Sequence, residues 1–130
     1  MHRFDLRVYY EDTDLAGIVY YANYLKFIER ARSEWVRSLG VDQAALRANE
    51  GIVFAVRHLT AEYLRPAVYD DLLEVHTTMT EITGARIRLA QSVWRGDALL
   101  FEAGVTLVCL TLAGRAARIP AAAREALTGT

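Results

Sequence analysis

The first pattern along the chain is an alternation of apolar and polar residues from Phe4 to Tyr10. Phe4, Leu6 and Val8 alternate with charged residues, and this period of two predicts a strand with one buried face. Acidic residues and Gly17 then break the pattern, because they favour a turn over an extended strand.

From Asn23 to Leu39 the period changes, and apolar residues recur every three or four positions. The apolar set consists of Tyr24, Phe27, Ile28, Ala31, Trp35 and Leu39. This spacing predicts a long helix with one buried side, which Gly40 is well placed to end. A short second helix is expected around Asp42 to Asn49, ending near Gly51.

Four strand-like runs follow the helices, and their connections are short. The runs are Ile52 to Leu64, Leu72 to Ile82, Arg86 to Trp94 and Leu99 to Leu112. Short connections favour antiparallel pairing. One or two helical turns are expected from Ala121 to Leu127, after Pro120. The order of elements predicts an α+β fold, in which a curved five-stranded antiparallel sheet wraps one long central helix. The last strand is nearly continuous in apolar residues, which suggests that a second subunit covers its outer face.

Composition narrows the class of protein. A chain of 130 residues, 53% of them hydrophobic, is expected to form a single globular domain over 1–130. The net charge of −1 gives no general attraction to nucleic acid. The one cysteine, Cys109, excludes an internal disulfide and fits a reducing compartment. With neither a signal peptide nor a long apolar run for a transmembrane segment, we expect a cytoplasmic protein.

The chemistry is expected in the acidic stretch YYEDTDLAGIVYYANYLKF, residues 9–27. A calcium loop starting at Asp12 fails, because Ala16 and Asn23 stand where oxygen ligands are required. The histidines lack metal-ligand spacing, so no metal site is expected. Two interpretations stay open. Asp12 and Asp14 stabilise a turn before the helix, or Asp14 attacks a carbonyl or activates water while helix N-terminal N–H groups hold the oxyanion.

The block VYYEDTDLAGIVYYANYLKFIERARSEW resembles the signature of hotdog-fold acyl-CoA thioesterases of the 4-hydroxybenzoyl-CoA thioesterase type. It is most similar to the branch associated with the Tol–Pal system. The similarity continues through the segments FAVR at 54–57, Glu62-Tyr63, Pro66-Ala67 and Asp70-Asp71, and so covers most of the chain.

This resemblance implies hydrolysis of acyl-CoA to free acid and CoA, without a cofactor. It implies that Asp14 is the catalytic carboxylate, as nucleophile or as general base for water, and that the Tyr21 backbone N–H polarises the thioester carbonyl. Gly17 and Val19 would shape the turn and the carbonyl site. Family active sites form between subunits, so a homodimer or homotetramer is implied, and an acyl carrier protein is a further candidate partner.

Coenzyme A phosphates need cations, and the candidates are Arg57, Arg86 and Arg88, with Arg86 as the predicted substrate-binding residue. A solvated strand face is the alternative explanation for these arginines. In one respect the chain departs from the Tol–Pal branch, whose members tend to have histidine at the position of Tyr21. A backbone N–H role survives this change.

Two other functions remain open at this stage. A hotdog-fold dehydratase acting on a 3-hydroxyacyl thioester usually pairs a histidine with a carboxylate, and no histidine lies in residues 9–27. A non-catalytic protein that binds acyl carriers or partner proteins is the other alternative.

Overall fold

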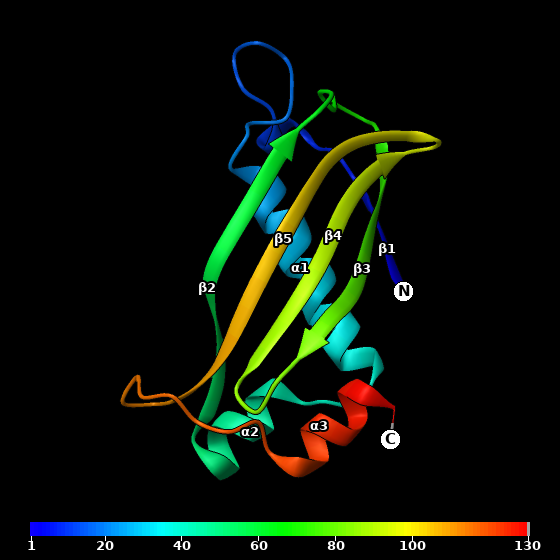
Figure 1. Ribbon diagram of the computed structural model, residues 1–130. Coiled ribbons are helices and arrows are strands. Elements are labelled where there is room, and N and C mark those ends of the chain that lie inside the picture. The colour runs from blue at the N-terminus through cyan, green and yellow to red at the C-terminus, as the bar shows by residue number, and fades with distance from the viewer. Residues whose placement is uncertain (130) are drawn as a thin grey trace.

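Five strands form one antiparallel sheet in the order β1-β3-β4-β5-β2, and the long helix α1 lies across one face of it (Figure 1). The computed structural model describes residues 1–129. The strands are β1 (His2–Arg7), β2 (Ile52–Tyr63), β3 (Leu72–Ile82), β4 (Arg86–Arg95) and β5 (Ala98–Thr111). The helices are α1 (Asn23–Ser38), α2 (Gln43–Glu50) and α3 (Ala121–Thr128), with a single 3-10 turn, η1 (Tyr10–Asp12), after β1.

The core lies between α1 and the inner face of the sheet. The buried side of α1 consists of Asn23, Tyr24, Phe27, Ile28, Ala31, Trp35 and Val36. It packs with inner-face residues of the central strands, among them Val75, Leu89 and Val105. Full burial of a valine, leucine, isoleucine or phenylalanine side chain contributes about 1.5–3 kcal/mol to the free energy of unfolding. The apolar spacing that predicts the helix is therefore also what fixes α1 on the sheet.

A curved antiparallel sheet around one long helix is the hotdog fold, so the predicted fold class is confirmed. The predicted element boundaries agree with the structure to within two residues, except for the first strand. That strand ends at Arg7 and not at Tyr10, because pairing with β3 stops at Arg7 and Leu72. Val8 bonds instead to the turn before β3, through its N–H to the Asp71 carbonyl at 3.0 Å.

The two sheet edges differ in length. β1 has six residues, whereas β2 has twelve and is paired only with β5. Along or just beyond β2, the apolar side chains of Val56, Tyr63 and Leu64 are about half exposed. Within residues 1–129, no helix is both long enough and apolar enough to cross a membrane.

Candidate active site

The acidic segment forms a tight hairpin between Thr13 and Val19, which pair as an isolated antiparallel bridge. The Asp14 N–H donates to the Ile18 carbonyl at 2.9 Å, and the Gly17 N–H donates back to the Asp14 carbonyl at 3.0 Å. A three-residue loop of this kind requires a left-handed last residue, and Gly17 has φ +80°. The predicted turn at Gly17 is therefore present.

The two aspartates of this segment, Asp12 and Asp14, lie in different environments. Asp12 is buried, and its carboxylate accepts the Tyr9 N–H at 2.8 Å, which stabilises the 3-10 turn. Asp14 is exposed, and its Oδ1 accepts only the Ala16 N–H, at 2.9 Å. Both carboxylates stabilise turns, as the first interpretation proposes. Asp14 alone is also accessible to a substrate.

A pocket of about 420 Å³ lies beside this hairpin, between the start of α1 and the end of β2. Its lining residues are Asp14, Ile18, Val19, Tyr20, Tyr21, Tyr24, Tyr63, Leu64, Arg65 and Pro66. The structure thus brings three of the predicted site residues, Asp14, Val19 and Tyr21, to one pocket. Gly17 lies in the adjoining turn and does not line it.

Backbone donors are available at the start of α1. Within residues 1–129, the N–H groups of Tyr21 and Ala22 make no hydrogen bond, and no side chain caps the helix. The Tyr20 carbonyl accepts the Asn23 N–H at 2.8 Å, which polarises the peptide that carries the Tyr21 N–H. Unpaired N–H groups at a helix N-terminus carry partial positive charge, so they suit a developing oxyanion.

Four tyrosines line the pocket, and the pKa is raised for Tyr20, Tyr24 and Tyr63. Burial raises the pKa of Tyr24, and burial with the neighbouring Tyr21 and Tyr24 hydroxyls raises the pKa of Tyr63. A hydrogen bond with Tyr21 raises the pKa of Tyr20. These hydroxyls therefore act as neutral donors and acceptors. Asp14 is the one carboxylate among the described residues that line the pocket.

Tyr63 was not predicted as a site residue, yet its hydroxyl donates to the Tyr21 carbonyl at 2.9 Å. The two residues are 42 positions apart, and nothing in the local pattern of either segment indicates the contact. The one sequence signal was the Glu62-Tyr63 pair within the family resemblance.

Arg86 lies elsewhere. It lines a hollow of about 840 Å³ on the outer face of the sheet, with Arg57, His58 and Arg88 among its other lining residues. Figure 1 shows the β3–β4 connection, which Arg86 follows, at the opposite end of the sheet from the hairpin that carries Asp14. Arg88 pairs with Glu81 at 3.5 Å, whereas Arg57 and Arg86 form no ion pair within residues 1–129. Within one chain, Arg86 and Asp14 do not share a site.

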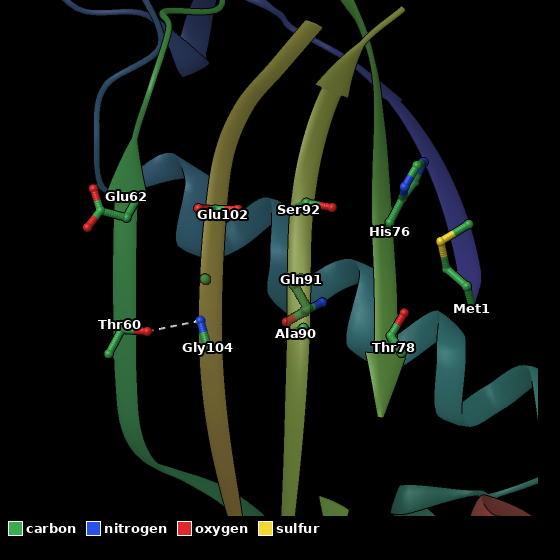
Figure 2. A pocket seen from close by; sticks show the side chains of 11 residues that line it. Met1, Thr60, Glu62, His76, Thr78, Ala90, Gln91, Ser92, Glu102 and Gly104 are labelled. Atoms are coloured by element: carbon green, nitrogen blue, oxygen red, sulfur yellow. Dashed lines mark hydrogen bonds between the residues drawn. The ribbon is translucent and has the colours of Figure 1, made fainter. Parts of the chain in front are cut away.

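A second hollow on the outer face, of about 410 Å³, is lined by Met1 and otherwise mostly by small and polar side chains (Figure 2). Glu62 and Glu102 lie directly opposite each other on β2 and β5, and the Gly104 N–H donates to the Thr60 hydroxyl at 3.1 Å. No group of three or more His, Cys, Asp or Glu side chains that could hold a metal ion occurs within residues 1–129. Apart from Met1, its lining residues all belong to strands, so it has no helix N-terminus of the kind that lies beside Asp14.

Comparison with known proteins gives concordant matches. The family model described as "Thioesterase superfamily" matches residues 16–102. The chain is 43% identical over 109 residues to "Acyl-CoA thioesterase YbgC" of Haemophilus influenzae, covering 84% of this chain and 80% of that protein. It is 44% identical over 111 residues to "Acyl-CoA thioester hydrolase YbgC" of Escherichia coli, covering 85% and 82%. The crystal structure of a probable thioesterase from Bartonella henselae superposes with a TM-score of 0.88 at 38% identity, covering 92% of this chain and 98% of that one.

Proposed function

Because the chain belongs to the thioesterase superfamily, we propose that it hydrolyses acyl-CoA thioesters to the free acid and CoA. The observation that carries this proposal is the pairing, in one pocket, of the exposed Asp14 carboxylate with residues whose backbone N–H groups have no partner. Thioester hydrolysis needs these two features, a group that attacks or activates water and donors for the carbonyl oxygen.

In the proposed reaction, the thioester carbonyl oxygen accepts the Tyr21 N–H. Asp14 then acts in one of two ways: it removes a proton from the water that attacks the carbonyl carbon, or it attacks that carbon itself to form an anhydride that water later hydrolyses. In both cases the C–S bond breaks and the CoA thiolate leaves. Gly17 and Val19 hold the Asp14 turn closed, Gly17 through its φ of +80° and Val19 through its bridge to Thr13.

We propose that the working unit is a homodimer or a homotetramer. β2 leaves one edge unpaired over twelve residues, and exposed strand edges with apolar side chains favour pairing with another chain. Arg86, proposed to bind CoA phosphates, lines a different hollow from the Asp14 pocket of its own chain. If a second subunit places its Arg86 beside the Asp14 pocket of the first, both residues belong to one active site.

The test is an Asp14→Asn variant, assayed for thiol release with a panel of acyl-CoAs. The acyl groups range from short aliphatic chains to long chains and aromatic groups. Glu11→Gln is the matched control, because Glu11 is an exposed acid in the same segment that does not line the pocket. We expect Asp14→Asn to lose hydrolysis and stay folded, while Glu11→Gln retains it. Near-wild-type turnover by Asp14→Asn would refute the assignment of Asp14.

The same panel tests the alternatives. Hydration of an enoyl-CoA without thiol release would favour a dehydratase, and binding of an acyl carrier protein without any turnover would favour a non-catalytic role. Within residues 1–129, one sheet and one core support the expected single domain, whose predicted bounds are 1–130. The cytoplasmic location, the Tol–Pal association and an acyl carrier protein partner stay predictions.

A further inference from the structure

We infer that Tyr63 is a positioning residue for the carbonyl site: its hydroxyl fixes the peptide planes at the start of α1 that carry the free N–H groups. This inference rests on the proposed function. The contact behind it is the hydrogen bond from the Tyr63 hydroxyl to the Tyr21 carbonyl, at 2.9 Å. It joins the end of β2 to the residue two positions before α1.

Tyr63 is itself held firmly. It is the last residue of β2 and pairs in register with Phe101 of β5. Its ring packs at 63° on the Phe101 ring and at 81° on the Tyr24 ring, with centroid distances of 5.0 and 5.5 Å. Both of those neighbours are buried, so the hydroxyl of a half-exposed side chain is directed from a rigid base. Because the pKa of Tyr63 is raised, the hydroxyl keeps its proton and remains a donor through neutral and mildly basic pH.

The bond controls the backbone donors through peptide geometry. The Tyr21 carbonyl and the Ala22 N–H belong to one planar peptide, so holding the carbonyl also sets the direction of that N–H. Donation to the carbonyl also polarises the peptide and strengthens the same N–H as a donor. The preceding peptide, which carries the Tyr21 N–H, is held by the bond from the Asn23 N–H to the Tyr20 carbonyl. Tyr63 thus supplies the second of two anchors that orient consecutive free N–H groups.

The experiment compares Tyr63→Phe with Tyr69→Phe. The first variant keeps the ring packing and removes only the hydroxyl. Tyr69 is a matched control because its side chain is 47% exposed, against 46% for Tyr63, and it does not line the pocket. For Tyr63→Phe we expect kcat to fall about fivefold to tenfold, the effect of losing one hydrogen bond that orients the transition state, while KM changes less than about twofold. Tyr69→Phe should keep both constants. A melting temperature close to that of the wild type would separate positioning from simple loss of stability.

A second measurement does not depend on turnover. The backbone 15N resonance of Ala22 and the carbonyl 13C resonance of Tyr21 report on the Tyr63 hydrogen bond, and both should shift in Tyr63→Phe and stay unchanged in Tyr69→Phe. Unchanged resonances, or an unchanged kcat in an active enzyme, would overturn the role of Tyr63. If the wild type hydrolyses no acyl-CoA, the proposed function fails and the resonances alone decide whether Tyr63 orients these peptides.

Discussion

The side-chain amide of Asn23 donates to the main-chain carbonyl of Asp12 at 2.9 Å, and both residues are about nine-tenths buried. The same carbonyl also accepts the Tyr20 N–H at 2.9 Å. Asn23 is the first residue of α1, and Asp12 ends the 3-10 turn before the hairpin. These two bonds therefore fasten the hairpin that carries Asp14 to the helix start that carries the free donors.

Replacing Asn23 with alanine should lower both stability and activity. It removes the buried donor and leaves the Asp12 carbonyl with one partner, at a cost of about 1–3 kcal/mol in the free energy of unfolding. Urea unfolding measures this loss, and thiol release should show lower kcat at temperatures where the variant is folded. Asn49→Ala, an exposed substitution on α2, is the control and should change neither quantity. Equal unfolding free energies for the two variants would contradict the role of this bond.

Substitution of Gly17 tests the turn itself. A Cβ at Gly17 would meet no atom within 4 Å, so the cost of a larger residue comes only from its left-handed backbone. We expect Gly17→Val to lose about 1–2 kcal/mol of stability, because a β-branched residue disfavours positive φ, and to reduce turnover by displacing Asp14. Gly17→Asn should lose less of both, since asparagine adopts this conformation more readily. A Gly17→Val protein with unchanged melting temperature and turnover would show that the turn tolerates strain.

The elements that could be predicted from the sequence are those in which apolar residues recur at a regular spacing over a long run. α1 and β3 begin where the spacing predicts. Their buried residues recur over three or more turns of the helix and at alternate positions along the strand. The first strand was predicted over Phe4 to Tyr10, whereas β1 spans His2–Arg7, so the predicted end lies three residues too far along the chain. Val8 to Tyr10 continue the apolar pattern, but their backbone bonds go to the turn before β3 and to the Asp12 carboxylate. The alternation of apolar and polar residues alone does not indicate where the hydrogen-bonded pairing of two strands ends.

The site was predictable where its residues are close in sequence and not where they meet by folding. Asp14, Val19 and Tyr21 lie within eight positions, so one motif carries them to one pocket. Tyr63 reaches that pocket only because β2 runs beside the start of α1. Arg86 was assigned from its charge alone, and charge does not specify the end of the sheet at which a residue lies.

The position of Arg86 yields a test of a shared site. If Arg86 serves the pocket of a neighbouring subunit, Arg86→Ala should raise KM for acyl-CoA at low salt and leave kcat nearly unchanged. Arg124→Ala, which removes an arginine from α3 that lines neither this hollow nor the Asp14 pocket, is the control.

Mixing variants then identifies the subunit that supplies each residue. Refolding Asp14→Asn together with Arg86→Ala should restore about a quarter of wild-type activity at substrate concentrations well below KM, because half of the dimers are mixed and each has one intact site. If both residues acted within one chain, the mixture would not exceed the average of the two variants. That result would place the phosphate site elsewhere.

Cys109 gives a pH dependence whose sign follows from its burial. Its side chain is inaccessible, its Sγ donates to the Arg118 carbonyl at 3.7 Å, and burial raises the pKa of the thiol. In the unfolded chain the thiol deprotonates near pH 8.5, before it does so in the folded protein. From about that pH upward the unfolded state binds fewer protons than the folded state, so the free energy of unfolding should fall, by at most about 1.4 kcal/mol per pH unit from this group. Urea unfolding at pH 7.5, 8.5 and 9.5 measures the slope, and the Cys109→Ala variant separates the thiol from tyrosines, which begin to ionise near the upper pH. Cys109→Ala should be less stable at pH 7.5 but show a flatter decline, and native wild-type protein should react with a thiol reagent only as fast as it unfolds. Rapid labelling of the folded protein, or identical slopes for the two proteins, would contradict a buried and protonated thiol.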